Sequence, residues 1–313
     1  DYGLWTIASA RAWPSFAAAL REESGIDVGL RQDGGYTLFL REDDVADRAA
    51  ALALACRRMP DQSLLWDVQE RARLARALPG VGPDVAGGLY CPLDGEVNIL
   101  RVMRALHVAL RRRGVSLLSP WVVERVEPLA GGGFLLRSGN QALEAAKVVL
   151  AAGLGNRRLA PWVGLSAPLR PQRGHIMVTA RLPRLLPVPT VSVRQTDEGS
   201  VLIGESKEEQ PEGDGVRPGI LAAQARRAIR LFPALANAAV VRSWAGMRVM
   251  TPDGLPLYDQ SALHPGAFVV ACHSGVTLAA IHAGRLAAMI AAGRLGAEVS
   301  AFSATRFDVL AAA

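Results

Sequence analysis

The fold of this chain is decided by residues 244–278, WAGMRVMTPDGLPLYDQSALHPGAFVVACHSGVTL. The stretch carries one arginine, Arg248, and then a short apolar strand predicted at residues 267–271. That strand leads into His273-Ser274-Gly275 and the start of a helix. A strand that ends in a glycine-containing turn and opens a helix directs several backbone N–H groups, and the positive end of the helix dipole, toward one place. The stretch therefore predicts a site for an anion or an electron-rich ring edge, with Arg248 as a second, separate receptor for an anion.

The composition excludes several classes of protein. A length of 313 residues suggests about two domains, and no apolar run reaches the roughly 18 residues that a membrane-spanning helix needs. The net charge of +6 comes from scattered arginines, since only Lys147 and Lys207 are lysines. The run Arg111-Arg112-Arg113 precedes Gly114 and is typical of a helix C-terminus. Because aromatic residues make up only 5% of the chain, stacking surfaces for bases are scarce, and nucleic-acid binding is not predicted.

The cysteine, histidine and serine patterns do not predict a nucleophile or a metal site. Cys56, Cys91 and Cys272 are odd in number and widely spaced, which is typical of thiols in a reducing cytoplasm. We therefore expect a cytoplasmic protein, at most peripheral to the inner membrane. Cys272 and His273 are neighbours on a strand and point to opposite faces, which argues against a Cys–His pair. The histidine spacing matches no metal site, and Ser274 lies outside a G-x-S-x-G motif.

Hydrophobic periodicity and turn signals predict a chain of alternating helices and strands. The strands at residues 28–31 and 36–40 flank Asp33-Gly34-Gly35 and are expected to form a hairpin. A turn at Gly131-Gly132-Gly133 is expected to join two further strands. Helices are predicted at residues 4–23, 43–58, 67–78, 97–113, 220–232 and 277–292, and the remaining strands at 115–118, 121–126, 134–137, 148–151, 174–179, 188–194 and 201–203.

At these residues the chain resembles the FAD-dependent D-amino acid oxidase superfamily. Within the superfamily it is most similar to the FAD subunits of hydrogen cyanide synthase, D-hydroxyproline dehydrogenase and opine oxidase. The matching segments are WAGMRVMTPDGLPL (244–257), VVACHSGVTLAAIHAGRLAAMI (269–290), LDGEVNILRVMRAL (93–106), VVLAAGLGNRRLAPWVGL (148–165) and PLRPQRGHIMVTARLPRLL (168–186).

The resemblance implies an α/β fold of mixed α+β type, with an FAD-binding Rossmann-like domain and a substrate domain built on a large, mostly antiparallel sheet. The family begins with a βαβ unit whose G-x-G-x-x-G motif contacts the FAD pyrophosphate. No such motif occurs among these 313 residues, so we expect that the unit either precedes Asp1 or has been lost. The implied boundaries are residues 1–93 and 166–243 for the substrate domain, with the leading helix 4–23 at the interface, residues 94–165 and 244–300 for the FAD-binding domain, and residues 301–313 for a C-terminal tail.

The resemblance also implies site residues. Arg248, in a G-x-R pattern, corresponds to the arginine that holds the substrate carboxylate; the residues alone leave a surface salt bridge open. His175, where relatives usually have glutamine, is expected at the flavin or the active-site wall, with a satisfied interior histidine as the alternative. Gly246 occupies the place of a cysteine in relatives with a covalent flavin, which implies non-covalent FAD. The residues expected to contact FAD are Val123, Ala152, Gly153, Gly246, His273, Ser274, Gly275, Val276 and Thr277.

The function implied is oxidation of the C–N bond of an amino or imino acid by hydride transfer to FAD, in a subunit of a multi-subunit dehydrogenase. Two alternatives stay open at this point: a stand-alone oxidase that uses oxygen, and a non-enzymatic docking subunit that has lost the FAD site. The expected ligands and partners are FAD, a small amino or imino acid and further subunits, without a metal, nucleic acid or a membrane span.

Overall fold

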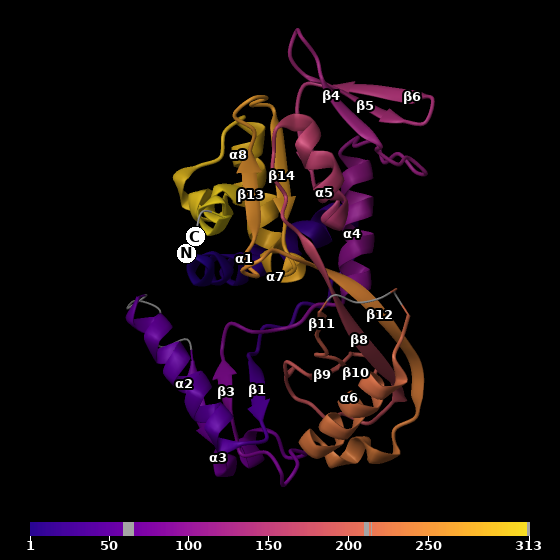
Figure 1. Ribbon diagram of the computed structural model, residues 1–313. Helices are drawn as coiled ribbons and strands as arrows, with labels where there is room; N and C mark the ends of the chain where they lie inside the picture. Colours follow the sequence, from indigo (N-terminus) through magenta and orange to yellow (C-terminus); the bar gives the residue numbers. More distant parts are fainter. Residues whose placement is uncertain (59–65, 210–212, 214, 312–313) are drawn as a thin grey trace. The chain divides into compact units, whose positions relative to one another are not determined.

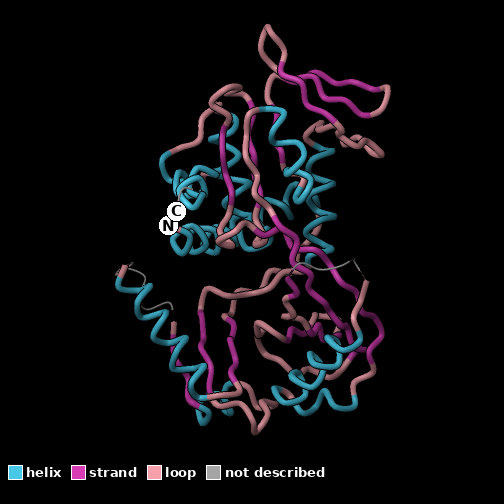
Figure 2. The backbone as a smooth tube through the Cα atoms, in the orientation of Figure 1, coloured by secondary structure: helices cyan, strands magenta, loops and turns pink. Residues whose placement is uncertain are grey.

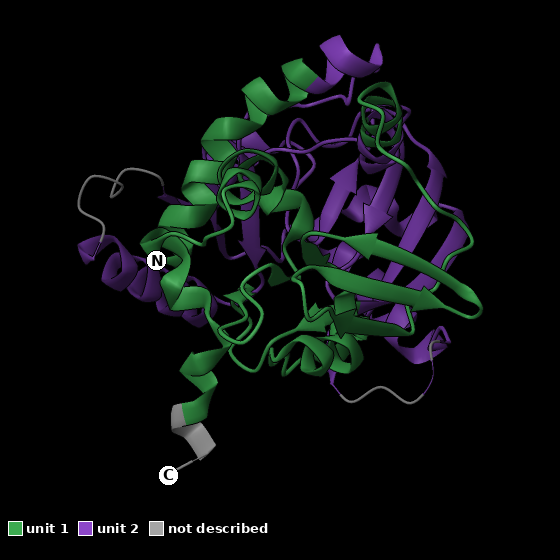
Figure 3. Ribbon diagram, turned by 90° about the horizontal axis from the view of Figure 1, so that it is seen from above, with its two compact units in different colours: residues 1–19, 106–172, 248–313 green, residues 20–105, 173–247 purple. Residues whose placement is uncertain are grey.

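The computed structural model describes residues 1–58, 66–209, 213 and 215–311. The chain forms two compact units, each assembled from segments that are far apart in the sequence (Figure 3). Unit 1 contains residues 1–19, 106–172 and 248–313, and unit 2 contains residues 20–105 and 173–247. Compared with the predicted domains, residues 1–19 group with the C-terminal segment, and residues 94–105 group with unit 2.

A parallel pair of strands forms the centre of unit 1. β7 (Val148–Leu150) runs parallel to β14 (Ala267–Ala271), and β13 (Leu257–Gln260) pairs antiparallel with the other edge of β14 (Figure 1). Phe268 and Val269 of β14 are fully buried, as expected for a strand whose two faces are both covered. This sheet is the Rossmann-like part of the predicted fold.

Helices pack on this sheet and form a second cluster of buried residues. α1 (Tyr2–Ser24) places Trp5 against Tyr258 of β13 and Leu278 of α7. α7 (Gly275–Ile281), a π-helical turn (His282–Leu286) and α8 (Ala287–Ala291) form one continuous helical segment, which confirms the helix predicted at 277–292. The other short helical segments of unit 1 are η2 (Gly153–Gly155), α5 (Asn156–Leu159), η3 (Ala160–Val163), η6 (Ala297–Phe302) and η7 (Ala304–Ala311).

A separate antiparallel sheet of unit 1 consists of β4 (Arg125–Pro128), β5 (Phe134–Ser138) and β6 (Gln141–Ala145) (Figure 2). Gly132 and Gly133 have positive φ in the turn between β4 and β5, as the glycine run predicted. The strand predicted at 115–118 is wrong, because these residues are exposed and lie outside any strand. The strand predicted at 121–126 begins only at Arg125, where pairing with β5 starts.

Unit 2 is built on a larger sheet with the order β11-β8-β10-β9, in which β12 also pairs with β8. One face of this sheet packs against α6 (Pro218–Leu231) through Met177, Val201 and Ile203. The sheet and the confirmed helix α6 make the core of the unit. The strands are β8 (Arg170–Arg181), β9 (Val193–Gln195), β10 (Ser200–Ile203), β11 (Glu208–Glu209) and β12 (Val240–Met250), and η4 (Pro233–Asn237) follows α6.

A smaller sheet of unit 2 corrects the predicted hairpin. β1 (Gly35–Phe39) pairs with β3 (Gly87–Cys91), not with residues 28–31, and β3 also pairs with β2 (Asp67–Glu70). Gly29 has φ +65°, which is incompatible with a regular strand. The helix predicted at 67–78 is wrong in its first turn, because β2 pairs there with β3. The helices beside this sheet are α2 (Glu42–Arg57), as predicted, and α3 (Arg71–Ala77), and α4 (Ile99–Arg112) confirms the helix predicted at 97–113.

Candidate functional site

Two strand-to-helix turns meet at one edge of the parallel strands in unit 1. β7 leads into Ala152 and Gly153, and β14 leads into the turn at residues 273–275. Because β7 and β14 are parallel, with Val149 opposite Phe268, their carboxyl ends lie at the same edge of the sheet. In open α/β sheets, ligands bind in the crevice outside the carboxyl ends of the strands. The structure thus brings together the two groups of residues that the sequence singled out.

Asn156, the first residue of α5, fastens these two strand ends to each other. Its side chain is fully buried. Oδ1 accepts a hydrogen bond from the backbone N–H of Ala152 at 2.9 Å, and Nδ2 donates to the carbonyl of Val270 at 3.3 Å. Asn156 was not among the residues predicted for the site, although asparagine at the start of a helix after two glycines is a signal for a capping or bridging side chain.

The backbone conformation and a close neighbour both favour glycine at position 153. Its φ is +57°, in the left-handed region that favours glycine. A Cβ at this position would lie 3.3 Å from Cγ2 of Val249, which is tighter than an ordinary contact. The turn after β7 therefore keeps its backbone close to its neighbours.

The start of α7 presents backbone donors at the surface. The N–H of Leu278 bonds the carbonyl of Ser274 at 3.0 Å, so the N–H groups of Gly275, Val276 and Thr277 precede the first intrahelical donor. These three residues are exposed, and among the residues that the structure describes, none outside this helix and its flanking turn has an atom within 4 Å of a Cβ built on Gly275. This end of the helix is open to an acceptor of hydrogen bonds.

Contacts with α1 hold this helix start in place. Trp13 Nε1 donates to the carbonyl of Val276 at 3.2 Å, and Ser9 Oγ donates to the carbonyl of Thr277 at 2.6 Å. Ser274 Oγ lies 2.9 Å from the hydroxyl of Tyr2 and 3.1 Å from Nδ1 of His273. The turn is therefore a rigid element of unit 1, and the imidazole of His273 remains exposed at its rim.

Cys272, next to His273, is an unreactive thiol. Burial raises the pKa of Cys272 to about 11. At neutral pH the group is therefore a protonated thiol and a poor nucleophile.

Arg248 lies on β12 and is half-buried. Its Nη1 donates to Oε1 of Gln172 at 3.3 Å, and Gln172 is itself buried. The amide of Gln172 thus contacts one end of the guanidinium. Gly246 lies two residues earlier on β12 and so on the same face of the strand. Within the described part of the chain, no atom beyond its chain neighbours lies within 4 Å of its Cβ position.

His175 has the surroundings of an interior histidine. It is fully buried on β8, and its Nε2 accepts the backbone N–H of Arg217 at 3.1 Å. Nδ1 lies 3.3 Å from Oγ of Ser206. Because Gln172 and His175 are three positions apart on β8, their side chains face opposite sides of the strand. These contacts favour a structural role, and a place for His175 at the active-site wall stays a prediction.

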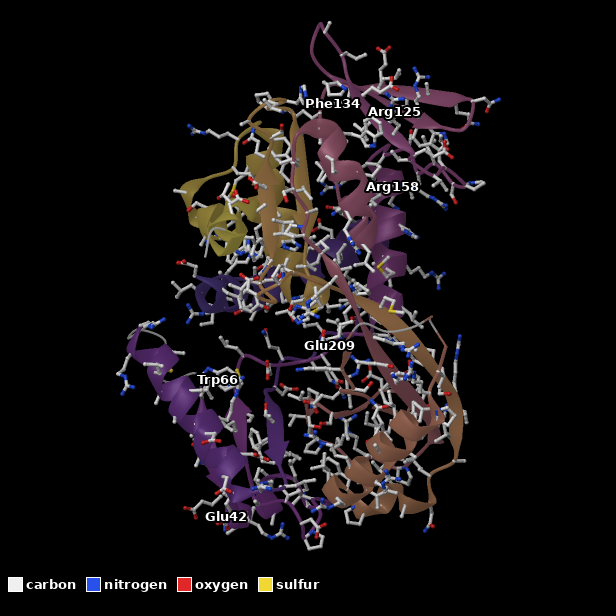
Figure 4. The ribbon with its side chains drawn as sticks, viewed as in Figure 1. Glu42, Trp66, Arg125, Phe134, Arg158 and Glu209 are labelled. Atoms are coloured by element: carbon white, nitrogen blue, oxygen red, sulfur yellow. The ribbon has the colours of Figure 1, made fainter. Side chains whose placement is uncertain are left out.

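Val123 precedes β4 and is half-buried. Its carbonyl accepts a hydrogen bond from Nη2 of Arg158 at 3.2 Å, and Arg158 extends from α5 (Figure 4). The segment before β4 is thereby attached to the helix that carries Asn156.

Two properties follow from a survey of the described residues. Among residues 1–58, 66–209 and 215–311, no three side chains of His, Cys, Asp or Glu gather as a metal-binding group. Across the same part of the chain, no helix combines the length and apolar character that a membrane crossing requires.

A parallel strand pair with glycine-containing turns at its carboxyl edge is typical of proteins that bind a dinucleotide. The family described as FAD dependent oxidoreductase (DAO) matches residues 3–289, and the chain belongs to this family. The predicted superfamily, the mixed α/β fold and the FAD cofactor are thereby confirmed.

Relatives of known name support this assignment. The chain is 46% identical over 306 residues to an opine oxidase subunit of Agrobacterium tumefaciens (strain Ach5), an alignment that covers 98% of this chain and 82% of that protein. It is also 46% identical over 311 residues to an opine oxidase subunit of Rhizobium meliloti, with the same coverage. Among solved structures, glycine oxidase from Geobacillus kaustophilus superimposes with a TM-score of 0.86 at 26% identity, covering 95% of this chain and 80% of that one.

The residues of unit 1 fit a flavin dinucleotide. The N–H groups at residues 275–277 suit oxygen acceptors, such as a phosphate or a ring carbonyl. A side chain at position 275 would meet open space, whereas a Cβ at position 153 would press closely on Val249. The backbone donors at residues 275–277 and the glycine turn at Gly153 both lie at the carboxyl edge of the parallel strands, where such cofactors bind.

Proposed function

We propose that this protein is the FAD-carrying subunit of a multi-subunit dehydrogenase that oxidises the C–N bond of an opine-type amino acid. Such a substrate is a secondary amine that bears a carboxylate-substituted carbon on each side. The observation that carries the proposal is 46% identity across 98% of the chain with an opine oxidase subunit. The similarity extends over nearly the whole chain and therefore includes both units.

Arg248 is the residue to which we assign the substrate carboxylate. The guanidinium fork makes two parallel, charge-assisted hydrogen bonds to a carboxylate. Nη1 of Arg248 donates to Oε1 of Gln172, and this contact helps to orient the guanidinium. Fixing one carboxylate restricts the orientation of the α-carbon, which is a positioning effect on the C–H bond that breaks.

The turns at the carboxyl edge of β7 and β14 are the residues to which we assign the cofactor. FAD would be held by Val123, Ala152 and Gly153 on one side, and by Gly246 with residues 273–277 on the other. When bound, FAD supplies the hydride acceptor. The backbone donors at residues 275–277 and the helix dipole behind them stabilise negative charge that develops close to them.

The chemistry needs little from protein acids and bases. The substrate amine, in its neutral form, gives up a hydride from the α-carbon and a proton from nitrogen, and becomes an imine. Water then adds to the imine and releases an amine and a keto acid. No residue of this chain is required as a general base, because the lone pair of the neutral amine assists the loss of hydride.

The electron acceptor separates this proposal from the oxidase alternative. We propose that electrons pass to a partner subunit, since the similar proteins carry the name of a subunit. We also propose a cytoplasmic location, which is supported by the buried thiol of Cys91.

The test is anaerobic reduction of the purified, FAD-loaded protein. N-(1-carboxyethyl) amino acids should bleach the flavin absorbance faster than glycine or proline at equal concentration. Subsequent mixing with air should reoxidise the flavin more slowly than turnover with the complete complex. Faster bleaching by glycine or proline would contradict the substrate class. Reoxidation at the rate of turnover would favour a stand-alone oxidase, and a colourless full-length protein would favour the docking subunit.

A further inference from the structure

We infer that unit 2 contains a second binding pocket, for a small organic anion with a flat apolar body. The cavity has a volume of about 700 Å³, and small-molecule sites measure roughly 300–1,000 Å³. Every residue that lines it belongs to unit 2. Its walls come from the segment at Gly29–Arg31, the start of α4, and strands β8, β9, β10 and β12.

The floor of the pocket is the face of the large sheet that α6 does not cover. Val178 of β8 lies opposite Leu202 of β10, which lies opposite Arg194 of β9. The alternating residues Met177 and Ile203 point the other way, into the core with α6. Val178 and Leu202 therefore give this face an apolar centre with an arginine at one end.

One wall of the pocket carries arginines whose charges are paired with carboxylates of the protein. Arg31 forms ion pairs with Glu96 and with Asp197, the latter at 3.2 Å. Arg194 lies 3.7 Å from Glu96 and donates from Nη1 to the carbonyl of Val97 at 3.0 Å. These groups hold the wall together, and their charges are matched within the protein.

The opposite side carries two arginines whose charge is not matched by a described carboxylate. Arg181 at the end of β8 and Arg242 on β12 both line the pocket. Within the part of the chain that the structure describes, neither has a carboxylate oxygen within the 4.0 Å of an ion pair. Arg242 lies over the ring of Trp244, 5.7 Å from its centroid, and Trp244 is 38% exposed. Two such guanidinium groups beside an exposed indole suit an anion attached to a planar ring.

This pocket is distinct from the carboxylate site assigned to Arg248. Arg242 and Arg248 are six residues apart on the same strand, which corresponds to about 20 Å at ~3.3 Å per residue. A small amino acid cannot span that length. The pocket therefore needs a ligand of its own, and the inference does not depend on the proposed reaction.

Calorimetry with matched probes tests the pocket in the FAD-loaded, full-length protein. The probes are 2-naphthoate, its uncharged analogue 2-naphthamide, and 2-naphthyl phosphate, which separates a preference for carboxylate from one for phosphate. One of the anions should bind, and 2-naphthamide should bind at least tenfold more weakly, because charged hydrogen bonds are lost. Arg181→Gln and Arg242→Gln should each weaken the anion about tenfold or more. Arg184→Gln, a change outside the pocket, should leave it unchanged.

The same titrations in Arg248→Lys separate the two sites. Binding to the unit 2 pocket should persist in this variant, whereas binding that vanishes there would belong to the substrate site and overturn the inference. Arg242→Lys keeps the positive charge and replaces Arg242→Gln in the test if the glutamine variant is less stable to heat. The lysine variant should retain most of the affinity for the anion. Equal binding of 2-naphthamide, or unchanged affinity in both glutamine variants, would also overturn the inference. If no probe binds, and Leu100→Ser at the exposed rim reduces co-purification of another subunit, the pocket is a protein-docking surface instead.

Discussion

The side-chain amide of Asn156 donates to the carbonyl of Val270 across the two parallel strands of unit 1, at 3.3 Å. The same side chain accepts the N–H of Ala152. One buried residue therefore fixes the spacing of the two turns that we assign to FAD. A polar side chain with no exposure is retained at such a place because both backbone groups need a partner.

Asn156→Ala should destabilise the protein and weaken FAD together. The change leaves the N–H of Ala152 and the carbonyl of Val270 without their partner, which costs about 1–3 kcal/mol in the free energy of unfolding. Urea denaturation and FAD titration of the apoprotein measure the two effects. Asn140→Ala, in an exposed turn, is the matched control. An unchanged FAD affinity in Asn156→Ala would show that the spacing of the turns does not matter for the cofactor.

Arg248→Lys should lower substrate efficiency while FAD and thermal stability are retained. An ammonium cannot reproduce the two parallel bonds of the guanidinium, and a lost charged hydrogen bond of about 1.5–3 kcal/mol corresponds to roughly a ten- to hundredfold fall in kcat/KM. Inhibition by a simple carboxylate should weaken in parallel. Arg137→Lys, in a surface ion pair with Glu127, should change neither. Early melting with intact inhibition would mean that Arg248 is structural.

FAD should be bound without a covalent link. The prediction rests on the family resemblance, which implies that Gly246 occupies the position where relatives with a covalent flavin have cysteine. Precipitation of the purified holoprotein with acid should leave yellow FAD in the supernatant. Flavin that stays with the pellet after denaturation would disprove this.

The stability of the protein should fall between about pH 6.5 and pH 4 through His282. Burial lowers the pKa of His282 to about 4, against about 6.5 in an unfolded chain. Its Nε2 lies 2.7 Å from the hydroxyl of Tyr258, which itself accepts a hydrogen bond from Trp5 Nε1 at 3.2 Å. Since the unfolded state binds the proton more tightly, the contribution is complete above the unfolded pKa and is lost as the pH falls through the folded one.

Chemical denaturation across that pH range measures the effect. His282→Gln can still accept from Tyr258, so its free energy of unfolding should depend less steeply on pH than that of the unaltered protein. Identical slopes in the unaltered protein and in His282→Gln would exclude His282 as the cause.

Cys272 should resist alkylation near neutral pH. Burial raises the pKa of its thiol to about 11, so the thiolate that reacts is scarce until the pH approaches that value. Mass spectrometry after timed exposure to iodoacetamide measures the modification at each cysteine. Rapid labelling of Cys272 in the folded protein at neutral pH would contradict the burial of this thiol. Cys272→Ser should retain the reaction, since Cys272 has no chemical role in it.

Local sequence signals predicted an element correctly where the segment has its own pattern of apolar residues. The helices at residues 4–23 and 220–232 have an apolar face of their own, and α1 and α6 confirm both. The hairpin predicted at residues 28–40 was wrong, because the partner of a strand depends on residues far away in the sequence. β1 pairs with Gly87–Cys91, about 50 positions further along the chain. The turn signal at Gly34-Gly35 predicted a local hairpin because it contains no information about this distant strand.

The sequence by itself determined the strand-turn-helix at residues 267–278, because glycine turns and helix starts are encoded by neighbouring residues. The family and the FAD cofactor followed from the resemblance of the sequence to known proteins. Only the tertiary structure decided which distant groups meet. It joined Ala152 to Val270 through Asn156 and oriented Arg248 with Gln172. It also surrounded His175 with Ser206 and Arg217 on the other face of β8. The physical reason is that hydrogen bonding and burial depend on groups brought together by packing, which no local pattern specifies.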